Sequence, residues 1–145
     1  MSTEQNKALA RQLVEEVLNQ GDMSRADELL AADFIEHEEL PPGVPTGREA
    51  PKQLTTMLRS AFPDFKATIN DLIAEGDKVV IHMTWNGTQQ GEFMGIPPTG
   101  KRISVGIFDI LRIAEGQIVE HWGLMDRMAM MQQLGVIPAP GQGES

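Results

Sequence analysis

Apolar residues recur at intervals of three and four along the first part of the chain and at intervals of about two after it. The three- and four-residue interval predicts a first helix, whose apolar positions are Ala8, Leu9, Leu13, Val17 and Leu18. Ser2 or Thr3 can cap the start of this helix, and Gly21 can end it. The chain therefore opens with an amphipathic helix.

Two further helices and one short strand are predicted before the pattern changes. Ser24 is the expected N-cap of a short second helix, and residues 34–37 indicate a brief strand. A Pro- and Gly-rich loop follows at residues 41–45. Residues 48–61 then predict a third helix, which Pro63 stops.

The later part of the chain favours strands. Strands are expected at 65–72, 78–85 and 88–93, with Asn86-Gly87 as a hairpin turn between the second and third. After a second Pro- and Gly-rich loop, two longer strands are expected at 102–113 and 117–125. Residues 127–134 suit a short terminal helix, and the tail at about 138–145 is expected to be loose.

Helices followed by an antiparallel meander indicate the α+β class. We expect one domain over residues 1–145, because no repeat or linker divides the chain and its length suits a single core. A strongly curved antiparallel sheet with the three N-terminal helices on one face would form a cone. The interior of such a cone is a natural pocket for a small molecule.

Composition narrows the classes of function. The chain has no Cys, which excludes disulfides, thiolate nucleophiles and zinc-thiolate sites. Its net charge of -9 argues against nucleic acid and anionic membranes as partners. With no apparent signal peptide or membrane span, we expect a cytoplasmic protein. We also expect a homodimer, formed through an outer sheet face that carries Trp122 and Leu124.

The register of the last two strands decides which side chains share a face. We take Ala114-Glu115-Gly116 as a three-residue loop with Gly116 in the left-handed conformation, so that Asp109 lies directly opposite His121. A two-residue turn would instead pair Asp109 with Trp122. We favour the first register because it gives the carboxylate a partner. One mostly apolar face then holds Ile107, Asp109, Leu111, Val119, His121, Gly123 and Met125.

An Asp beside a His in an apolar pocket has a chemical interpretation and a structural one. The carboxylate can fix the tautomer of His121 and raise its basicity, so the pair could take a proton from carbon or water. Alternatively, the pair only pins two strands together.

Glu36-His37 is the second polar cluster, at the end of the short strand. Alternation sends one of the two side chains inward, although Glu38 and Glu39 follow and make a solvated edge an alternative. We expect His82 on the outer face or as a hydrogen-bonded core histidine.

Motifs for metals, nucleotides and serine hydrolases are missing from the sequence. No HxH or HExxH spacing, GxGxxG, GxxxxGK[ST] or GxSxG occurs, and we expect neither a metal nor a cofactor. We take Asp109, His121 and Glu36 as candidate catalytic residues. The expected pocket-lining residues are His37, Ile107, Leu111, Gly123, Met125 and Trp85.

The segment GEFMGIPPTGKRISVGIFDILRIAEGQIVEHW, followed by Asp126 and QQLG, resembles the SnoaL-like polyketide cyclase family, also called ester cyclases, of the NTF2-like superfamily. ADFIEH near the N-terminus, the P-x-G-REA helix start and AFPDF at 61–65 match the same family. The resemblance covers about residues 5–137. It implies an NTF2-like cone and ring closure of an aromatic polyketide ester by intramolecular aldol condensation, without metal or cofactor.

The resemblance also implies an altered set of pocket residues. The family's acid/base carboxylate on the last strand falls at Gly123, and its pocket histidine on the preceding strand falls at Asp109. The polar residue two positions earlier becomes Ile107, and an asparagine near the first strand corresponds to Glu36. The carboxylate is missing from its own place, and two other positions carry acids. We expect extra room at Gly123.

Three functions remain open at this point. The first is a cofactor-free acid/base enzyme of cyclase or isomerase type acting on a small apolar or aromatic carbonyl or ester compound, with Asp109 or Glu36 as base and His121 orienting it or stabilising the enolate. The second is a non-catalytic small-molecule binding module, which Gly123 favours. The third is a cofactor-free hydrolase of epoxide-hydrolase type.

Overall fold

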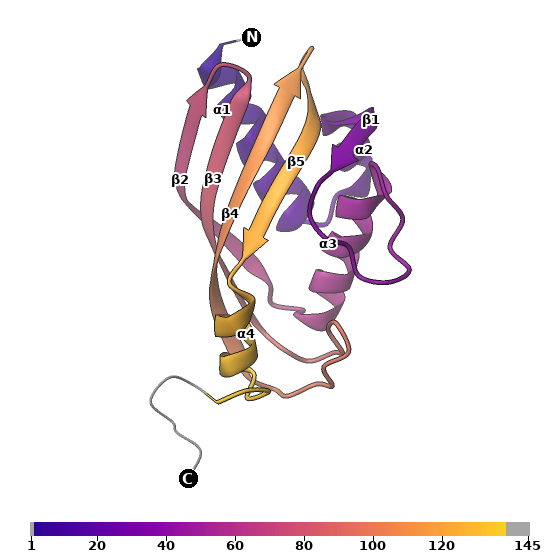
Figure 1. Ribbon diagram of the computed structural model, residues 1–145, viewed down its shortest axis with the longest axis vertical. Helices are drawn as coiled ribbons and strands as arrows, with labels where there is room; N and C mark the ends of the chain where they lie inside the picture. Colours follow the sequence, from indigo (N-terminus) through magenta and orange to yellow (C-terminus); the bar gives the residue numbers. More distant parts are fainter. Residues whose placement is uncertain (1, 139–145) are drawn as a thin grey trace.

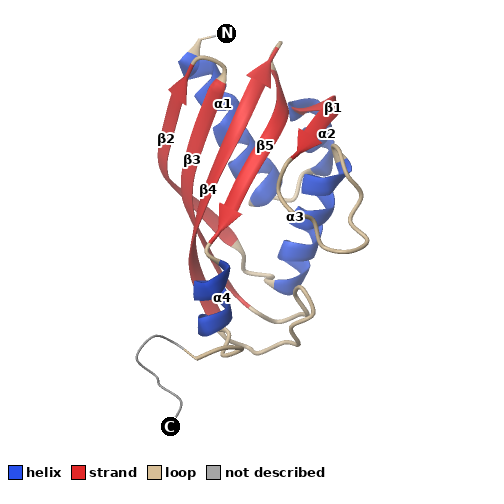
Figure 2. Ribbon diagram, in the orientation of Figure 1, coloured by secondary structure: helices blue, strands red, loops and turns tan. Residues whose placement is uncertain are grey.

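A five-stranded, strongly curved sheet carries helices on one of its faces (Figures 1 and 2). The computed structural model describes residues 2–138 of the 145-residue chain. The expected α+β class is confirmed. Apart from residue 138, the tail that we expected to be loose lies outside the described residues.

The N-terminal helices begin at side-chain caps. In α1 (Thr3–Gln12), the Ser2 hydroxyl accepts from the backbone N–H of Gln5 while the Gln5 side chain accepts from Ser2. The helix continues as a π-helical segment, η1 (Leu13–Leu18). The cap of α2 (Met23–Leu29) is Asp22, so the expected cap Ser24 is wrong. The Asp22 carboxylate accepts from both Arg25 N–H and the Ser24 hydroxyl.

The sheet has the order β1-β5-β4-β3-β2. Its strands are β1 (Leu30–Glu36), β2 (Lys66–Glu75), β3 (Lys78–Thr88), β4 (Arg102–Ala114) and β5 (Gln117–Met125). Strands β2 to β5 form an antiparallel meander, but β1 pairs parallel to β5, so the sheet is not entirely antiparallel as expected. Helix α3 (Glu49–Ala61) follows β1, and α4 (Arg127–Gln133) follows β5.

The core lies between the sheet and helices α1 to α3, which Figure 1 shows on one side of the strands. Residues from the helices and from the inner sheet face are buried there, among them Ala10, Val14, Leu58, Ile81, Met83, Ile107 and Leu111. The outer sheet face is open instead, because Phe108 and Leu124 are 54% and 75% exposed. The inner face at one end of this core holds the polar residues described below.

Gly87 lies inside a strand, and the hairpin expected at Asn86-Gly87 is wrong. Strand β3 continues through both residues, and Gly87 pairs with Ile103 of β4. A Cβ at Gly87 would lie 3.0 Å from Cβ of buried Phe62. The glycine is therefore needed for close packing, which a dipeptide turn signal cannot reveal.

The strand expected at 88–93 does not form either. The chain leaves β3 at Thr88 and makes a loop to Arg102, in which Phe93 and Ile96 form one isolated bridge. The fully buried Gln89 holds this loop, since its side chain donates to the Ile96 carbonyl and accepts from Thr99. The side-chain amide of Gln89 thus holds the loop together with backbone hydrogen bonds, among them those of Gln89 with Lys101 and Gly100.

The last hairpin has a register that neither sequence alternative gave. Its turn has two residues, Glu115 and Gly116, both with positive φ (51° and 77°), so Ala114 pairs with Gln117. A β-bulge then makes Val119 an extra residue, after which Arg112 pairs with Glu120. Buried Ile118 thereby takes the core position expected for Val119, and residues 121, 123 and 125 keep the inner face.

The described residues include no helix that is long and apolar enough to cross a membrane.

We predict that Gly87→Ala destabilises the fold by about 1–3 kcal/mol, because the added methyl group overpacks against Phe62. Gly106→Ala is the matched control: Gly106 lies in the adjacent strand, and a Cβ there would meet nothing within 4 Å. Urea unfolding of both variants measures the difference. Equal stability of the two variants would show that the contact with Phe62 does not constrain the backbone.

Candidate functional site

An apolar pocket opens between the inner sheet face and helix α3. Its walls come from η1, β1, α3, β3, β4 and β5, and a polar group of Glu36, Glu38, Asp109 and His121 lies among them. The enclosed part has a volume of about 130 Å³. An open groove of about 700 Å³ shares five residues with it, which are Glu39, Pro41, Met57, Met94 and Arg127.

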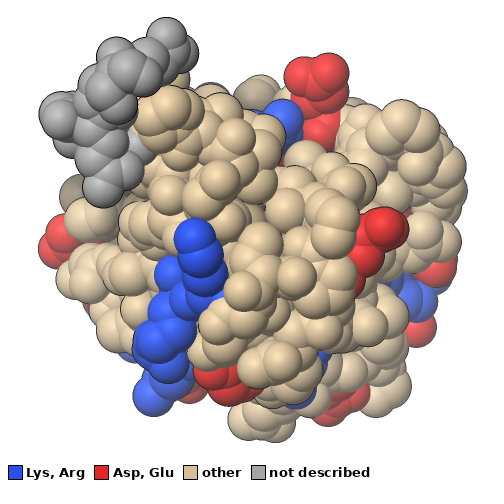
Figure 3. All heavy atoms as spheres, turned by 90° about the horizontal axis from the view of Figure 1, so that it is seen from below, with Lys and Arg blue, Asp and Glu red and all other residues tan. Residues whose placement is uncertain are grey.

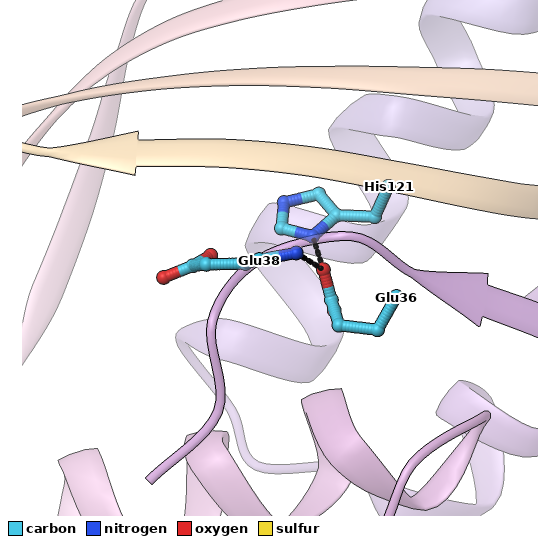
Figure 4. Close-up of side chains that lie close together, drawn as sticks. All are labelled: Glu36, Glu38 and His121. Atoms are coloured by element: carbon cyan, nitrogen blue, oxygen red, sulfur yellow. Dashed lines mark hydrogen bonds and ion pairs between the residues drawn. The ribbon is translucent and has the colours of Figure 1, made fainter.

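His121 stands at the centre of the polar group, between two carboxylates. Its Nδ1 bonds to Oε2 of Glu36, and its Nε2 lies 3.1 Å from Oδ1 of Asp109 (Figure 4 shows the bond to Glu36). The side chains of His121 and Asp109 are only 15% and 13% exposed, and that of Glu36 is 1% exposed. The three residues come from β5, β1 and β4, so the contacts join three strands.

The carboxylates keep the imidazole ring protonated. Burial by itself would lower the pKa of His121, but the hydrogen bonds and negative charges of Asp109 and Glu36 outweigh burial and raise the pKa to about 10. Both ring N–H groups then act as donors, one to each carboxylate. At neutral pH His121 is thus a cation and cannot itself accept a proton.

The parallel pairing of β1 with β5 positions Glu36. Glu36 lies beside His121 in the register, and alternation along β1 turns its side chain inward. Besides the bond from His121, Oε2 accepts the backbone N–H of Glu38 at 3.2 Å. The other oxygen, Oε1, is buried with no hydrogen-bond partner among the described residues.

The contact that we expected between Asp109 and His121 is present, although the register behind that expectation is wrong. Asp109 pairs with Gly123, and His121 pairs with Leu111. Because both residues stay on the inner face, they meet diagonally across neighbouring strands. The predicted face was correct because the turn and the bulge together shift the register by two residues, which preserves the alternation.

Gly123 does not leave the extra room that we expected, because Glu38 occupies that space. A Cβ at Gly123 would lie 2.5 Å from Oε1 of Glu38, 2.7 Å from Oδ1 of Asp109 and 2.8 Å from Cε1 of His121. Any side chain at position 123 would therefore collide with the polar group. Because Gly123 of β5 has no side chain, the carboxylate of Glu38, which follows β1, can lie there.

Four of the six predicted pocket-lining residues line the pocket, and His37 and Gly123 do not. Ile107, Leu111, Met125 and Trp85 contribute to its wall, and Trp85 presents a buried indole N–H with no partner in the described part of the chain. His37 points to the outer face, where it bonds to Glu120 at 2.7 Å and stacks on Trp122 at 4.6 Å. Alternation along the strand separates it from Glu36. His82 also lies on the outer face, where its ring stacks on that of Phe108.

Sequence reasoning missed three charged residues that line the pocket, Glu38, Glu39 and Arg127. Burial raises the pKa of the Glu38 carboxyl; the positive charge of His121 opposes this, and the negative charges of Asp109 and Glu36 add to it. The two-residue spacing between Glu36 and Glu38 in an extended segment was the available signal, since such residues face the same side. The run of acids that continues to Glu39 suggested a solvated edge instead.

The donor atoms of Glu36, Glu38 and His121 lie within 4.8 Å of one another, close enough to hold a metal ion. A metal would have to displace a proton from His121, whose two nitrogens already face Glu36 and Asp109. The charges of two carboxylates and one imidazole would suit a divalent cation. The expected absence of a metal stays a prediction.

Comparison with known proteins gives a consistent result. The model of the SnoaL-like polyketide cyclase family matches residues 8–134. Nogalonic acid methyl ester cyclase of Streptomyces nogalater is 29% identical over 119 residues, which cover 81% of this chain and 88% of that protein. Aklanonic acid methyl ester cyclase DauD of Streptomyces sp. strain C5 is 32% identical over 112 residues, covering 72% and 69%. The structure of TsrD from Streptomyces laurentii superposes with a TM-score of 0.85 at 32% identity, covering 94% of this chain and 99% of that one.

We predict that His121 stays doubly protonated at pH 8, which nitrogen-15 NMR of the ring can measure. The chain has only three histidines, so a His121→Gln variant assigns the signal. Folding raises the pKa of His121 from 6.5 to about 10. The stability that its pairing with the carboxylates contributes is therefore fully present below about pH 6.5 and is lost as the pH rises to about 10. Wild type should therefore lose more stability than His121→Gln between pH 7 and 10. A ring that titrates near 6.5 would contradict this prediction.

Proposed function

The chain belongs to the SnoaL-like polyketide cyclase family, and we propose that it is a cofactor-free enzyme that performs acid/base chemistry on an apolar or aromatic carbonyl or ester compound. The reaction we favour is an aldol-type ring closure, with isomerisation as the related alternative. The observation that carries the proposal is the cation of His121 between Glu36 and Asp109 at the end of an apolar pocket.

Asp109 is the proposed base. Both Asp109 and Glu36 line the pocket, but the Asp109 side chain is 13% exposed and that of Glu36 only 1%. His121 holds the carboxylate in position and offers a positive charge close to a developing enolate. Glu36 then acts as a positioning residue that fixes the ring and balances its charge.

The shape of the pocket supports an aromatic ester as substrate. A ring system is larger than the enclosed volume of about 130 Å³, but the groove of about 700 Å³ continues from it past Met57 and Met94. The reacting end would lie inside, and the rest of the molecule would lie in the groove. Two relatives are named for methyl esters of nogalonic and aklanonic acid, so these compounds are the first substrates to test.

The end of the molecule seen in Figure 3 shows one prominent band of Lys and Arg atoms and several separate Asp and Glu patches among the other side chains. Arg127 belongs to both the pocket and the groove, so a positive charge is available near the mouth. The pocket, lined mostly by apolar side chains, suits a mainly apolar compound with few polar groups. We therefore keep the small molecule as the proposed partner, and the expected absence of nucleic acid and of membrane as partners stays a prediction.

In the sequence, the missing acid at Gly123 was the observation that favoured a non-catalytic binding module. Because the Glu38 carboxylate reaches the same point in space, the pocket still has an acid there. This argument moves our preference towards an enzyme. The proposed location in the cytoplasm rests only on the sequence.

We predict that Asp109→Asn lowers kcat on the aromatic methyl esters by about 100-fold or more, because a positioned base contributes at least that much. The fold should survive, since an amide can keep a contact with His121. Asp71→Asn is the matched control, because Asp71 makes a similar contact with His82 (3.4 Å) on the exposed outer face. Ring closure is followed by loss of the open-chain ester in liquid chromatography.

Unchanged turnover in both Asp109→Asn and Glu36→Gln would contradict the assignment of the base. Tight binding of aromatic esters by the wild type with no turnover of any carbonyl compound would favour the binding module. Incorporation of labelled water oxygen into a product would favour the hydrolase.

We further propose a homodimer formed through the outer sheet face. Trp122, which suggested this surface, is partly covered by His37 and Lys78, but Phe108 and Leu124 lie side by side on β4 and β5 and are exposed. Light scattering at micromolar concentration should give the mass of a dimer for the wild type and of a monomer for Leu124→Asp. A monomeric wild type would contradict the proposal.

A further inference from the structure

Glu38 enters the polar group from outside the sheet. Strand β1 ends at Glu36, and the backbone N–H of Glu38 then donates to the Glu36 carboxylate, which fixes the direction of the chain. Figure 4 shows the Glu38 side chain running away from Glu36, past the His121 ring. Its carboxylate ends over Gly123. A Cβ atom at position 123 would lie 2.5 Å from Oε1 of Glu38 and 2.7 Å from Oδ1 of Asp109.

The carboxyl of Glu38 differs from its two neighbours in its partners. Glu36 and Asp109 both contact the His121 cation, whereas no ion pair or hydrogen bond reaches the Glu38 carboxylate within residues 2–138. A third negative charge at this place would be repelled by the other two and would be poorly solvated. The position therefore favours the neutral acid, which has an O–H group to donate and lies at the wall of the pocket.

We propose that Glu38 is the proton donor of this site: its carboxylic acid delivers a proton to the carbonyl oxygen that becomes an alkoxide when the new carbon–carbon bond forms. This inference rests on the proposed function and adds a second catalytic residue to it. Two carboxyl groups in contrasting environments then divide the work. Asp109, paired with a cation, removes a proton, and Glu38, unpaired, supplies one.

The step balances without any further reactant. Asp109 takes a proton from the carbon next to the activating carbonyl, and the C–H electron pair becomes the enolate. The enolate carbon attacks the second carbonyl carbon, so a C–C bond forms while the C=O π pair moves to oxygen. That oxygen takes the proton of Glu38, whose O–H bond breaks. The proton on Asp109 then returns to Glu38, directly or through water.

This division of work separates two measurable events. Exchange of the acidic C–H hydrogen with D2O needs only the base, whereas ring closure needs both groups. With nogalonic acid methyl ester as the probe, Glu38→Gln should keep hydrogen exchange within about threefold of wild type and lose ring closure by about 100-fold or more. Asp109→Asn should lose both. Glutamine keeps the size of the side chain, and Glu75→Gln at the exposed end of β2 is the control.

The outcomes distinguish the two proposals. Loss of exchange and ring closure to the same degree in Glu38→Gln would make Glu38 the base and overturn the present assignment. Full ring closure in that variant would overturn any catalytic role for Glu38. If wild type exchanges no hydrogen of the probe and closes no ring, the acid/base function itself is overturned, and the role of Glu38 falls with it.

The pH profile is the readout that a purely structural role would not change. The groups that face Glu38 are Glu36 from β1, Asp109 from β4, His121 from β5 and Arg127 from α4. Because burial raises the pKa of Glu38 and only its neutral form donates, kcat for ring closure in the wild type should fall as pH rises through that pKa. In Glu38→Gln this decline should disappear below about pH 10, where His121 loses its proton. A decline that stays unchanged would overturn the assignment.

Discussion

The cation of His121 between two carboxylates is the interaction on which the site depends. It joins β1, β5 and β4, so the parallel edge strand is tied to the meander by side chains as well as by backbone hydrogen bonds. Burying such a group is costly, because each charge loses its hydration, and the mutual attraction must offset that loss. Apolar residues of similar volume often stabilise a fold at least as well as a buried ion pair does. The three charged groups here are therefore weak evidence for stability, and they fit the proposed acid/base chemistry.

The charge count of the polar group explains the contrast between its carboxyls. Glu36, Asp109 and the His121 cation together carry one negative charge, and an ionised Glu38 would add another in the same apolar surroundings. The positive charges of His121 and Arg127 oppose that cost, yet burial, with the charges of Asp109 and Glu36 added, still raises the pKa of Glu38. One cation shared by two acids thus leaves the third acid without a partner. Protonation of Glu38, as proposed, would avoid this second negative charge.

The elements and the face of the site could be predicted from the sequence, but the contacts between elements could not. The period of the apolar residues indicated the helices and most strands, and alternation placed Asp109 and His121 on one face. The role of Gly87 depends on packing against the distant residue Phe62, which local patterns do not contain, and no local pattern indicated the bulge at Val119. Glu38 was missed for the same reason. Its two-residue spacing from Glu36 was visible, but the gap over Gly123 that receives it exists only in the folded sheet.

Gly123 and Glu38 are best understood as one linked feature of the site. A side chain at position 123 and the carboxylate of Glu38 would occupy the same space, so each arrangement excludes the other. An acid that rises from β5 is held by a strand, whereas Glu38 is held by one backbone hydrogen bond at the start of a loop. The resemblance alone would report the acid at position 123 as lost, whereas Glu38 brings a carboxylate to the same place from the segment after β1.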